Sequence, residues 1–156
     1  MATVLVTGGA GFIGSHVTAE LLRRRHAVRV IDNFSTGSRE NLAAVGGDVE
    51  LIEGDIRSCE RTHAATEGVD CVIHLAALPS VPRSVQDPLT TNEVNVTGTL
   101  NVVLAARDAG TQRVVMASPS SAYGRAQELP KTEGSCRSRS RPTACRSWRR
   151  SSTAWG

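Results

Sequence analysis

A glycine-rich turn near the start of the chain constrains the fold more than any other stretch. An apolar run, Val4–Val6, leads into a segment that holds Gly8, Gly11 and Gly14, and a helical pattern follows over 12–25. Strand, glycine turn and helix in this order are the context in which a dinucleotide-phosphate motif is credible. A plain strand–turn–helix, in which the glycines serve only the turn, is the alternative.

Each glycine has a physical reason to occupy its place in a phosphate-binding turn. Gly8 permits the tight turn off the strand, Gly11 lets the backbone approach a pyrophosphate, and Gly14 lets the helix pack close to the strand. The pyrophosphate would lie on free N–H groups at the positive end of the helix dipole. These groups belong to the first helical residues, among them Phe12 and Ile13.

An acidic residue ends the second expected strand. Asp32 lies 18 residues beyond Gly14, where a carboxylate can accept hydrogen bonds from the adenosine ribose hydroxyls. The same charge would repel a 2′-phosphate, so the sequence favours NAD over NADP. An Asx turn leading into Asn33 is the alternative interpretation.

Strands and helices alternate along the rest of the chain. Strands are expected at 3–6, 27–31, 49–52, 69–75 and 113–117, and helices at 12–25, 39–45, 58–67 and 88–109. This alternation predicts an α/β fold of Rossmann type, a doubly wound parallel sheet with right-handed crossovers. Ligands then bind beyond the carboxyl ends of the strands. Five candidate residues fall at such ends: Gly8, Asp32, Asp55, Ala76 and Ser118.

The pattern also predicts local packing. We expect an irregular loop over 79–84, which is polar and contains two prolines, and a structural, hydrogen-bonding role for His74. The expected buried faces are Ile13, Val17, Leu21 and Leu22 in the first helix, and Val94, Leu100, Val103 and Leu104 in the last.

Charge and cysteine content narrow the classes of function. The chain has a net charge of +3, but residues 135–156 hold six arginines and no acidic residue, so 1–134 carry −3. The body therefore offers no nucleic-acid footprint. With no membrane span and no signal-peptide pattern, we expect a cytoplasmic protein. The four cysteines have no metal-ligand spacing, so free thiols and no metal site are expected.

These motifs resemble those of the extended short-chain dehydrogenases, specifically the NAD-dependent nucleotide-sugar epimerases and dehydratases. The resemblance covers 1–134, which it marks as an NAD-binding Rossmann domain. The matching stretches are TGGAGFIGSH at 7–16, IDNFSTG at 31–37, GDIR at 54–57, HLAA at 74–77, NEVNVTGTLNVVLAARDAG at 92–110, SSAYG at 120–124 and LPKTE at 129–133.

The resemblance implies a role for individual positions. Asp32 and Asn33 would hold the adenosine ribose, and Asp55 and Ile56 would flank the adenine. The cofactor would be lined by Leu75, Ala76, Ala77 and Asn95, and Ser80 and Arg83 belong to a loop similar to one that binds substrate in UDP-sugar 4-epimerases. A homodimer through the helix matching 88–109 is also implied.

Two serines indicate which reaction of the family this sequence resembles. Dehydratases of the family carry acids at the positions of Ser120 and Ser121, where they drive elimination of water. The serine-rich version resembles the 4-epimerases, which act on UDP-glucose or UDP-galactose through a transient 4-keto sugar. Another nucleotide-sugar dehydratase or reductase is the alternative. In the family, a tyrosine takes the 4-hydroxyl proton and a lysine four residues later lowers its pKa.

The C-terminal end departs from this pattern. The assisting serine or threonine is replaced by Pro119, with Ser118 and Ser120 beside it as substitutes. No tyrosine follows Tyr123 and no lysine follows Lys131, so the Tyr-x-x-x-Lys pair is missing. As written, the chain is expected to bind NAD without catalysis, as a fragment without the C-terminal substrate domain.

Residues 136–156 read CRSRSRPTACRSWRRSSTAWG, a string unlike any packed domain. GC-rich codons for it, read from the third base, give Pro-Glu-Pro-Ile-Ser-Pro-Tyr-Gly-Val-Ser-Lys-Leu-Ala-Ala-Glu-Gln-His-Gly-Leu, which restores Tyr-x-x-x-Lys. We therefore hypothesise a single-base loss near the codons for Ser135 and Cys136. A basic, disordered tail over 135–156, or one that binds RNA, is the alternative.

Overall fold

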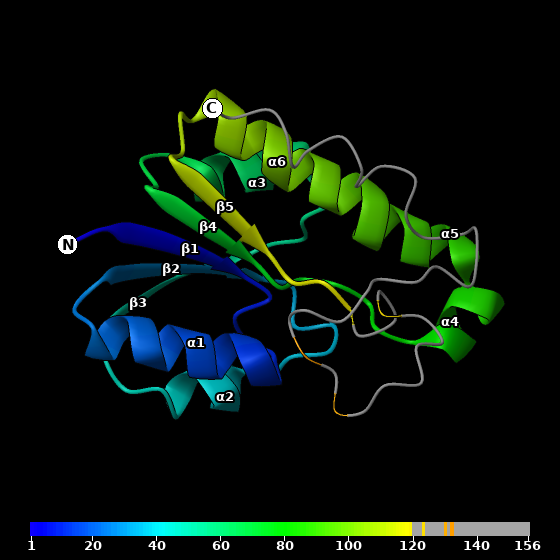
Figure 1. The fold of residues 1–156 in the computed structure, drawn as a ribbon, viewed down its shortest axis with the longest axis horizontal. Coiled ribbons are helices and arrows are strands. Elements are labelled where there is room, and N and C mark those ends of the chain that lie inside the picture. The colour runs from blue at the N-terminus through cyan, green and yellow to red at the C-terminus, as the bar shows by residue number, and fades with distance from the viewer. Residues whose placement is uncertain (120–122, 124–129, 131, 133–156) are drawn as a thin grey trace. The chain divides into compact units, whose positions relative to one another are not determined.

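The computed structural model describes residues 1–119, 123, 130 and 132, and the chain divides into two compact units, 1–117 and 118–156. The helices and strands described below belong to the first unit (Figure 1). In chain order they are β1 (Thr3–Thr7), α1 (Phe12–Arg23), β2 (Ala27–Asp32), α2 (Arg39–Ala43), β3 (Val49–Glu53), α3 (Cys59–Thr66), β4 (Cys71–His74), α4 (Val81–Gln86), α5 (Pro88–Asn92), the π-helix η1 (Glu93–Gly98), α6 (Thr99–Asp108) and β5 (Arg113–Met116).

The five strands form one parallel sheet in the order β3-β2-β1-β4-β5. The chain builds outward from β1 to β3, then crosses over to β4 and builds outward on the other side. Helices α1 and α2 cover one face of the sheet, and α3 and α6 cover the other (Figure 1). The expected doubly wound Rossmann-type sheet is therefore confirmed, and its strand order reverses between β1 and β4.

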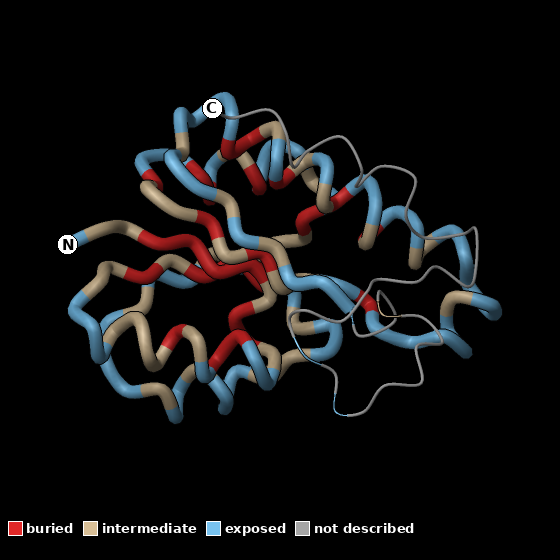
Figure 2. Tube along the Cα trace, viewed as in Figure 1, coloured by how far each residue is buried: buried red, intermediate tan, exposed pale blue. Residues whose placement is uncertain are grey.

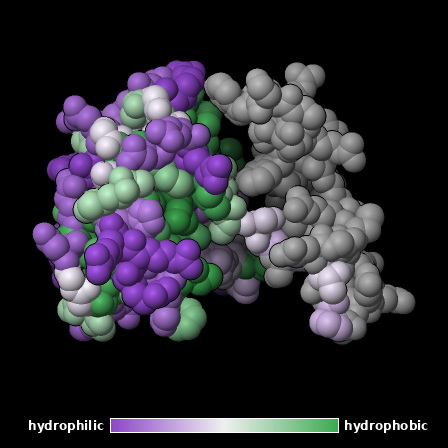
Figure 3. All heavy atoms as spheres, turned by 60° about the vertical axis from the view of Figure 1, so that its left-hand side comes forward, coloured by the Kyte–Doolittle hydropathy of each residue, from purple (hydrophilic) through white to green (hydrophobic). Residues whose placement is uncertain are grey.

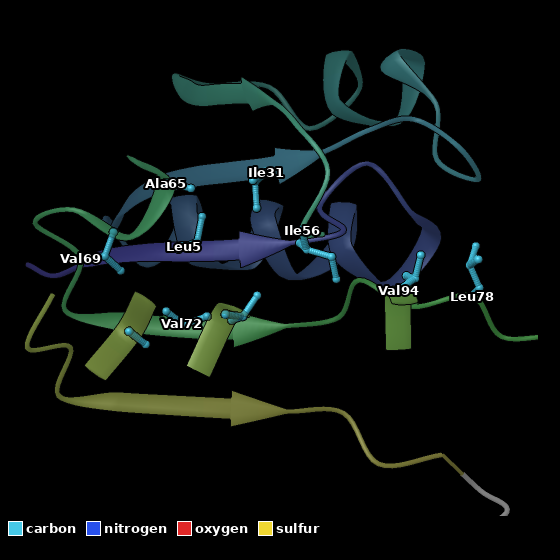
Figure 4. Packing of buried hydrophobic residues seen from close by; sticks show 10 residues of the cluster. Leu5, Ile31, Ile56, Ala65, Val69, Val72, Leu78 and Val94 are labelled. Atoms are coloured by element: carbon cyan, nitrogen blue, oxygen red, sulfur yellow. The ribbon is translucent and has the colours of Figure 1, made fainter. Parts of the chain in front are cut away.

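The apolar core lies on both faces of the sheet (Figure 2). Successive strand residues point to opposite faces, so Leu5 packs toward α6 while Val6 packs toward α1. On the α6 face, Leu5 and Val72 are fully buried with Val102 (Figure 4). On the α1 face, Val6 and Val30 form the centre of a smaller cluster. Truncating such a side chain typically costs about 2–5 kcal/mol.

Helix α1 is shorter than expected and buries smaller residues. It ends at Arg23, because Arg25 adopts a left-handed φ of 63° where the chain reverses into β2. The expected burial of Ile13 is wrong, since 62% of this residue is exposed in the first turn. The other three expected residues, Val17, Leu21 and Leu22, are partly buried and pack against the smaller cluster. The fully buried positions are Gly14, Ser15 and Thr18, because small side chains let the helix approach the sheet closely.

The region expected as one helix over 88–109 consists of α5, η1 and α6. The junction residues Glu93 and Thr99 keep helical backbone angles, so the chain stays helical while its hydrogen bonding changes. Val94 is buried as expected, while Leu100 and Val103 are exposed rather than buried, which corrects the expectation at these two positions. The buried stripe is made of small residues and valines, namely Val94, Gly98, Val102, Ala105 and Ala106.

Gly98 explains this exchange of large for small residues. A Cβ built on Gly98 would lie 2.7 Å from the side chain of Ile56, so the helix packs too closely for a larger residue there.

The segment 79–84 is not the irregular loop that was expected, since α4 begins at Val81 in its middle. Ser80 caps α4 by accepting the N–H of Arg83 at 3.3 Å, and proline is well tolerated in the first turn.

A buried chain of hydrogen bonds links β1, β4 and α6 through His74. The Thr7 hydroxyl oxygen accepts the N–H groups of Leu75 and Ala76, each at 3.2 Å, so its proton is free to point at His74 Nδ1, 2.7 Å away. His74 Nε2 lies 3.0 Å from the Thr99 hydroxyl, which itself donates to a helix carbonyl. This pattern requires a neutral imidazole with the proton on Nε2, and it confirms the structural role expected for His74.

Side chains on the face shown in Figure 3 are largely hydrophilic, with a smaller hydrophobic band. Among the helices of the described residues, none is long and apolar enough to cross a membrane.

The buried state of His74 predicts a pH-dependent stability. Burial lowers its pKa from 6.5 to about 4. Between these values the unfolded chain binds a proton that the folded chain does not, so the free energy of unfolding falls as the pH falls. The expected loss is about 1.4 kcal/mol per pH unit from this group. Urea unfolding at pH 7 and pH 4.5 measures it.

The variants His74→Gln and His16→Gln isolate this contribution. The first should flatten the dependence between pH 6.5 and 4, while the second, which changes an exposed histidine bonded to a helix carbonyl, should retain it. Equal pH dependence in all three chains would contradict a buried neutral His74.

Candidate functional site

The candidate site lies at the carboxyl ends of β1, β2 and β4, where the strand order reverses (Figure 1). The glycine turn follows β1, Asp32 ends β2, and the segment from Leu75 follows β4. In open parallel sheets, this crevice is where ligands bind.

Two glycines are required by close packing within the turn. Gly8 has a left-handed φ of 71°, and a Cβ there would lie 2.8 Å from the backbone of Ala76. A Cβ on Gly14 would lie 2.2 Å from the carbonyl oxygen of Gly8. The turn, the start of α1 and the segment after β4 are therefore held together by contacts that tolerate no side chain.

Gly11 is less crowded than Gly8 and Gly14. Among the described residues, a Cβ there would meet the Gly8 carbonyl oxygen alone, in a close contact at 3.3 Å. Gly11 caps α1 without a side-chain hydrogen bond, and the first helical bond runs from Ser15 N–H to its carbonyl at 2.9 Å. The N–H groups of Phe12, Ile13 and Gly14 have no acceptor among the described residues. Such donors, at a helix start whose capping residue has no side chain, fit an anionic group such as a pyrophosphate.

Asp32 is buried, and both of its carboxylate oxygens are engaged. Oδ2 accepts the N–H of Ala10 at 2.9 Å, and Oδ1 accepts the N–H of Phe34 at 2.8 Å. The second bond is the Asx turn that was the alternative interpretation. The first ties the glycine turn to the end of β2. Each oxygen retains a lone pair that could accept a ribose hydroxyl. The ribose contact itself stays a prediction.

Asp55 lies beside Asn33, at the end of a network of hydrogen bonds and ion pairs that was not expected from the sequence. The Asn33 amide donates to Asp55 Oδ2 at 2.8 Å. Arg57 donates to both Asp55 oxygens, at 2.8 and 3.1 Å, and also pairs with Glu93 at 3.2 Å. The Arg57 guanidinium holds the pKa of Asp55 below its ordinary value. The only sequence signal for this pairing is the position of Arg57, two residues beyond Asp55.

Several predicted site residues take structural roles. The Ile56 side chain is buried in the core, and its carbonyl accepts Thr62 and Asn101, so only its backbone N–H is left for a ligand. Leu75 packs against the smaller core cluster, while Ala77 is exposed.

Asn95 fixes the chain after β4. Its Oδ1 accepts the Leu78 N–H at 2.8 Å and its Nδ2 donates to the Leu78 carbonyl at 3.2 Å, so both sides of the amide are occupied. The residue lies in the π-helix η1, a feature frequent at functional sites. Its expected proximity to a cofactor stays a prediction.

The remaining candidates are spread over α4 and the second unit. Ser80 is engaged as the cap of α4, and Arg83 is exposed on the same helix. Ser118 is exposed in the second unit, and Ser120 lies outside the described residues. Within the described part of the chain, no cluster of three histidine, cysteine or acidic side chains could hold a metal ion.

Comparisons with known proteins agree with this geometry. A family model described as NAD dependent epimerase/dehydratase family matches residues 4–145. A UDP-glucose 4-epimerase of Klebsiella pneumoniae is 40% identical over 136 residues, which cover 83% of this chain and 98% of that relative. The other curated relatives compared are covered over only 39–42% of their length.

Solved structures give the same result. The UDP-glucose 4-epimerase of Stenotrophomonas maltophila, with bound NAD and formylated UDP-arabinopyranose, has a TM-score of 0.81 and 33% identity, covering 88% of this chain and 43% of that one. The dTDP-glucose 4,6-dehydratase DesIV of Streptomyces venezuelae, with NAD and TYD bound, has a TM-score of 0.77 and 38% identity, covering 88% and 45%. The chain belongs to the NAD dependent epimerase/dehydratase family.

Proposed function

We propose that the first unit binds NAD. The observation that carries this is the start of α1, where the N–H groups of Phe12 and Ile13 have no acceptor in the described part of the chain and Gly11 adds no side chain. The negative charge of Asp32 lies at the end of the neighbouring strand, bonded to the same turn at Ala10. A dinucleotide supplies both an anion for the helix and ribose hydroxyls for the carboxylate.

The chain's own residues would divide the binding among them. The start of α1 would hold the pyrophosphate, and Asp32 with Asn33 the adenosine ribose. Asp55, oriented by Arg57, would lie beside the adenine. When bound, NAD would supply reversible hydride transfer at C4 of a sugar. Proton transfer would need a tyrosine–lysine pair, which the chain as written lacks, and Ser118 or Ser120 would only assist it.

The substrate proposed for the intact parent is a UDP-sugar of the glucose or galactose type, epimerised at C4. Ser120 and Ser121 favour this over dehydration, because no acid is present there to drive loss of water. The dehydratase DesIV is as similar in fold as several epimerases, so a dehydratase or reductase is the second candidate. Exposed Leu100 and Val103 on α6 support the homodimer implied for the family.

We further propose that residues 136–156 are a shifted reading of the family's Tyr-x-x-x-Lys segment. The chain spans about two fifths of most relatives, so the activity belongs to a longer parent. The chain as written would be a cytoplasmic NAD-binding fragment without catalysis.

The charge of Asp32 predicts a preference between cofactors. Titration calorimetry of the 156-residue chain should give NAD a dissociation constant at least about tenfold below that of NADP, equivalent to about 1.4 kcal/mol. The reason is that a 2′-phosphate would add negative charge next to this carboxylate. Equal affinity for the two, or tighter binding of NADP, would contradict the assignment.

Gly11→Ala tests the start of α1 itself. The new methyl group would lie in ordinary backbone conformation but in the path of the pyrophosphate, so NAD affinity should fall by about tenfold or more while the fold is retained. Gly110→Ala is the control for a general loss of stability. It introduces backbone strain at a φ of 68°, at a position distant in sequence from the turn. If Gly11→Ala leaves NAD binding intact, the pyrophosphate does not lie there.

The frame hypothesis is tested on DNA. Sequencing the source across the codons for Val115 to Arg141 should reveal one additional base near codons 135 and 136. The corrected gene should then yield a chain that interconverts UDP-glucose and UDP-galactose, measured by a coupled assay. A DNA sequence identical to the one implied by the present chain would refute the shift and leave NAD binding as the function to be measured.

A further inference from the structure

Cys59, His63 and Asp108 form a chain of side chains on the surface of the first unit, outside the nucleotide site. Cys59 is the first residue of α3, His63 lies one turn later, and Asp108 ends α6. The Cys59 sulfur lies 3.4 Å from His63 Nδ1, and His63 Nε2 lies 3.2 Å from Asp108 Oδ2. The arrangement brings a nucleophile, an imidazole and a carboxylate from two packed helices into line.

The contacts of His63 define its charge state. Nδ1 lies 2.8 Å from the Cys59 carbonyl oxygen, which can only accept, so Nδ1 carries a proton. Nε2 faces the Asp108 carboxylate, which also accepts, so Nε2 carries a proton as well. The Cys59 carbonyl and Asp108 accordingly raise the pKa of His63. The imidazolium then presents a shared Nδ1–H to the Cys59 sulfur, so a nucleophile lies within reach of an imidazole that a third group orients.

Charged groups of both signs surround His63 without displacing its contact with the Cys59 sulfur. From α6, Arg107 pairs with Asp108 Oδ1 at 2.7 Å and slightly opposes protonation of His63. Glu67 lines the same shallow hollow between α3 and α6. From β2, Arg29 donates to the carbonyls at the far end of α3. His63 and Asp108 side chains are about two fifths exposed, so a solute can reach them.

Cys71 provides an internal comparison. It lies on β4, is half-buried, and has no hydrogen-bond partner among the described residues. Burial raises the pKa of its thiol. Two cysteines of one chain therefore differ in exposure and in their nearest charged group.

We propose that Cys59 is a site of reversible S-thiolation by low-molecular-weight disulfides such as glutathione disulfide. The Cys59 thiolate attacks one sulfur of the disulfide and a new S–S bond forms. The old S–S bond breaks, and the second glutathione leaves as a thiolate that takes up a proton from solvent. Cys59 is oxidised to the mixed disulfide, and the departing sulfur is reduced.

Kinetic mapping of the full chain tests this. The protein is mixed with glutathione disulfide at a series of pH values between 5.5 and 9, quenched with an alkylating reagent, and digested for mass spectrometry. We expect Cys59 to form the adduct faster than Cys71 across this pH range. In His63→Gln, its rate at pH 6.5 should fall about three- to tenfold and its pH profile should change, because the imidazole beside the sulfur is lost.

Two further variants keep the test decisive. Asp108→Asn should lower the rate in the same direction, and it serves if His63→Gln fails to fold. His16→Gln is the matched control, since His16 makes the same 2.8 Å contact to a helix carbonyl but has no neighbouring cysteine. A Cys59 pH profile unchanged by His63→Gln and Asp108→Asn, or adducts formed first on Cys71, would overturn the proposal.

Discussion

The contact between Gly14 and the carbonyl of Gly8 is the constraint on which the rest of the site depends. A Cβ would come within 2.2 Å of that oxygen, so no other residue lets α1 begin so close to the end of β1. This closeness places the free N–H groups of the first helical turn at the carboxyl edge of the sheet. It also brings Ala10 within reach of Asp32, which joins the turn to β2. The packing requirement and the placement of these N–H groups are thus one arrangement.

The opposite side of the site is fixed by buried polar groups rather than by close backbone contact. The Thr7 hydroxyl accepts hydrogen bonds from two N–H groups of the segment after β4 and donates one to His74 Nδ1. His74 Nε2 in turn contacts the Thr99 hydroxyl on α6. Such groups are costly to bury unless every donor and acceptor is satisfied. Because these hydrogen bonds form together in only one geometry, they fix the positions of β1, β4 and α6 relative to one another. Asn95 fixes Leu78 in the same way, by accepting its N–H.

The sequence could predict the parts of this site that depend on local patterning. Gly8, Gly14 and Asp32 were identified because each follows directly from a strand end or a helix start. Arg57 and Glu93 were missed because they lie 36 residues apart and meet only through the packing of η1 beside the end of β3. The expected buried faces were right in part. Val17, Leu21 and Leu22 pack against the core and Val94 is buried, as expected. Ile13, Leu100 and Val103 are exposed. At the closest contacts the helices bury Gly14 and Gly98 and leave larger residues outside.

The two acids at this edge are not equivalent, and the difference bears on cofactor choice. Asp55 is paired with the guanidinium of Arg57, so its charge is largely compensated. Asp32 accepts only backbone N–H groups, and among the described residues no cation pairs with it. Neutral donors orient a carboxylate without cancelling its charge. For the proposed NAD site, we therefore expect the uncompensated charge at the end of β2 to disfavour a 2′-phosphate and to favour ribose hydroxyls, which are donors.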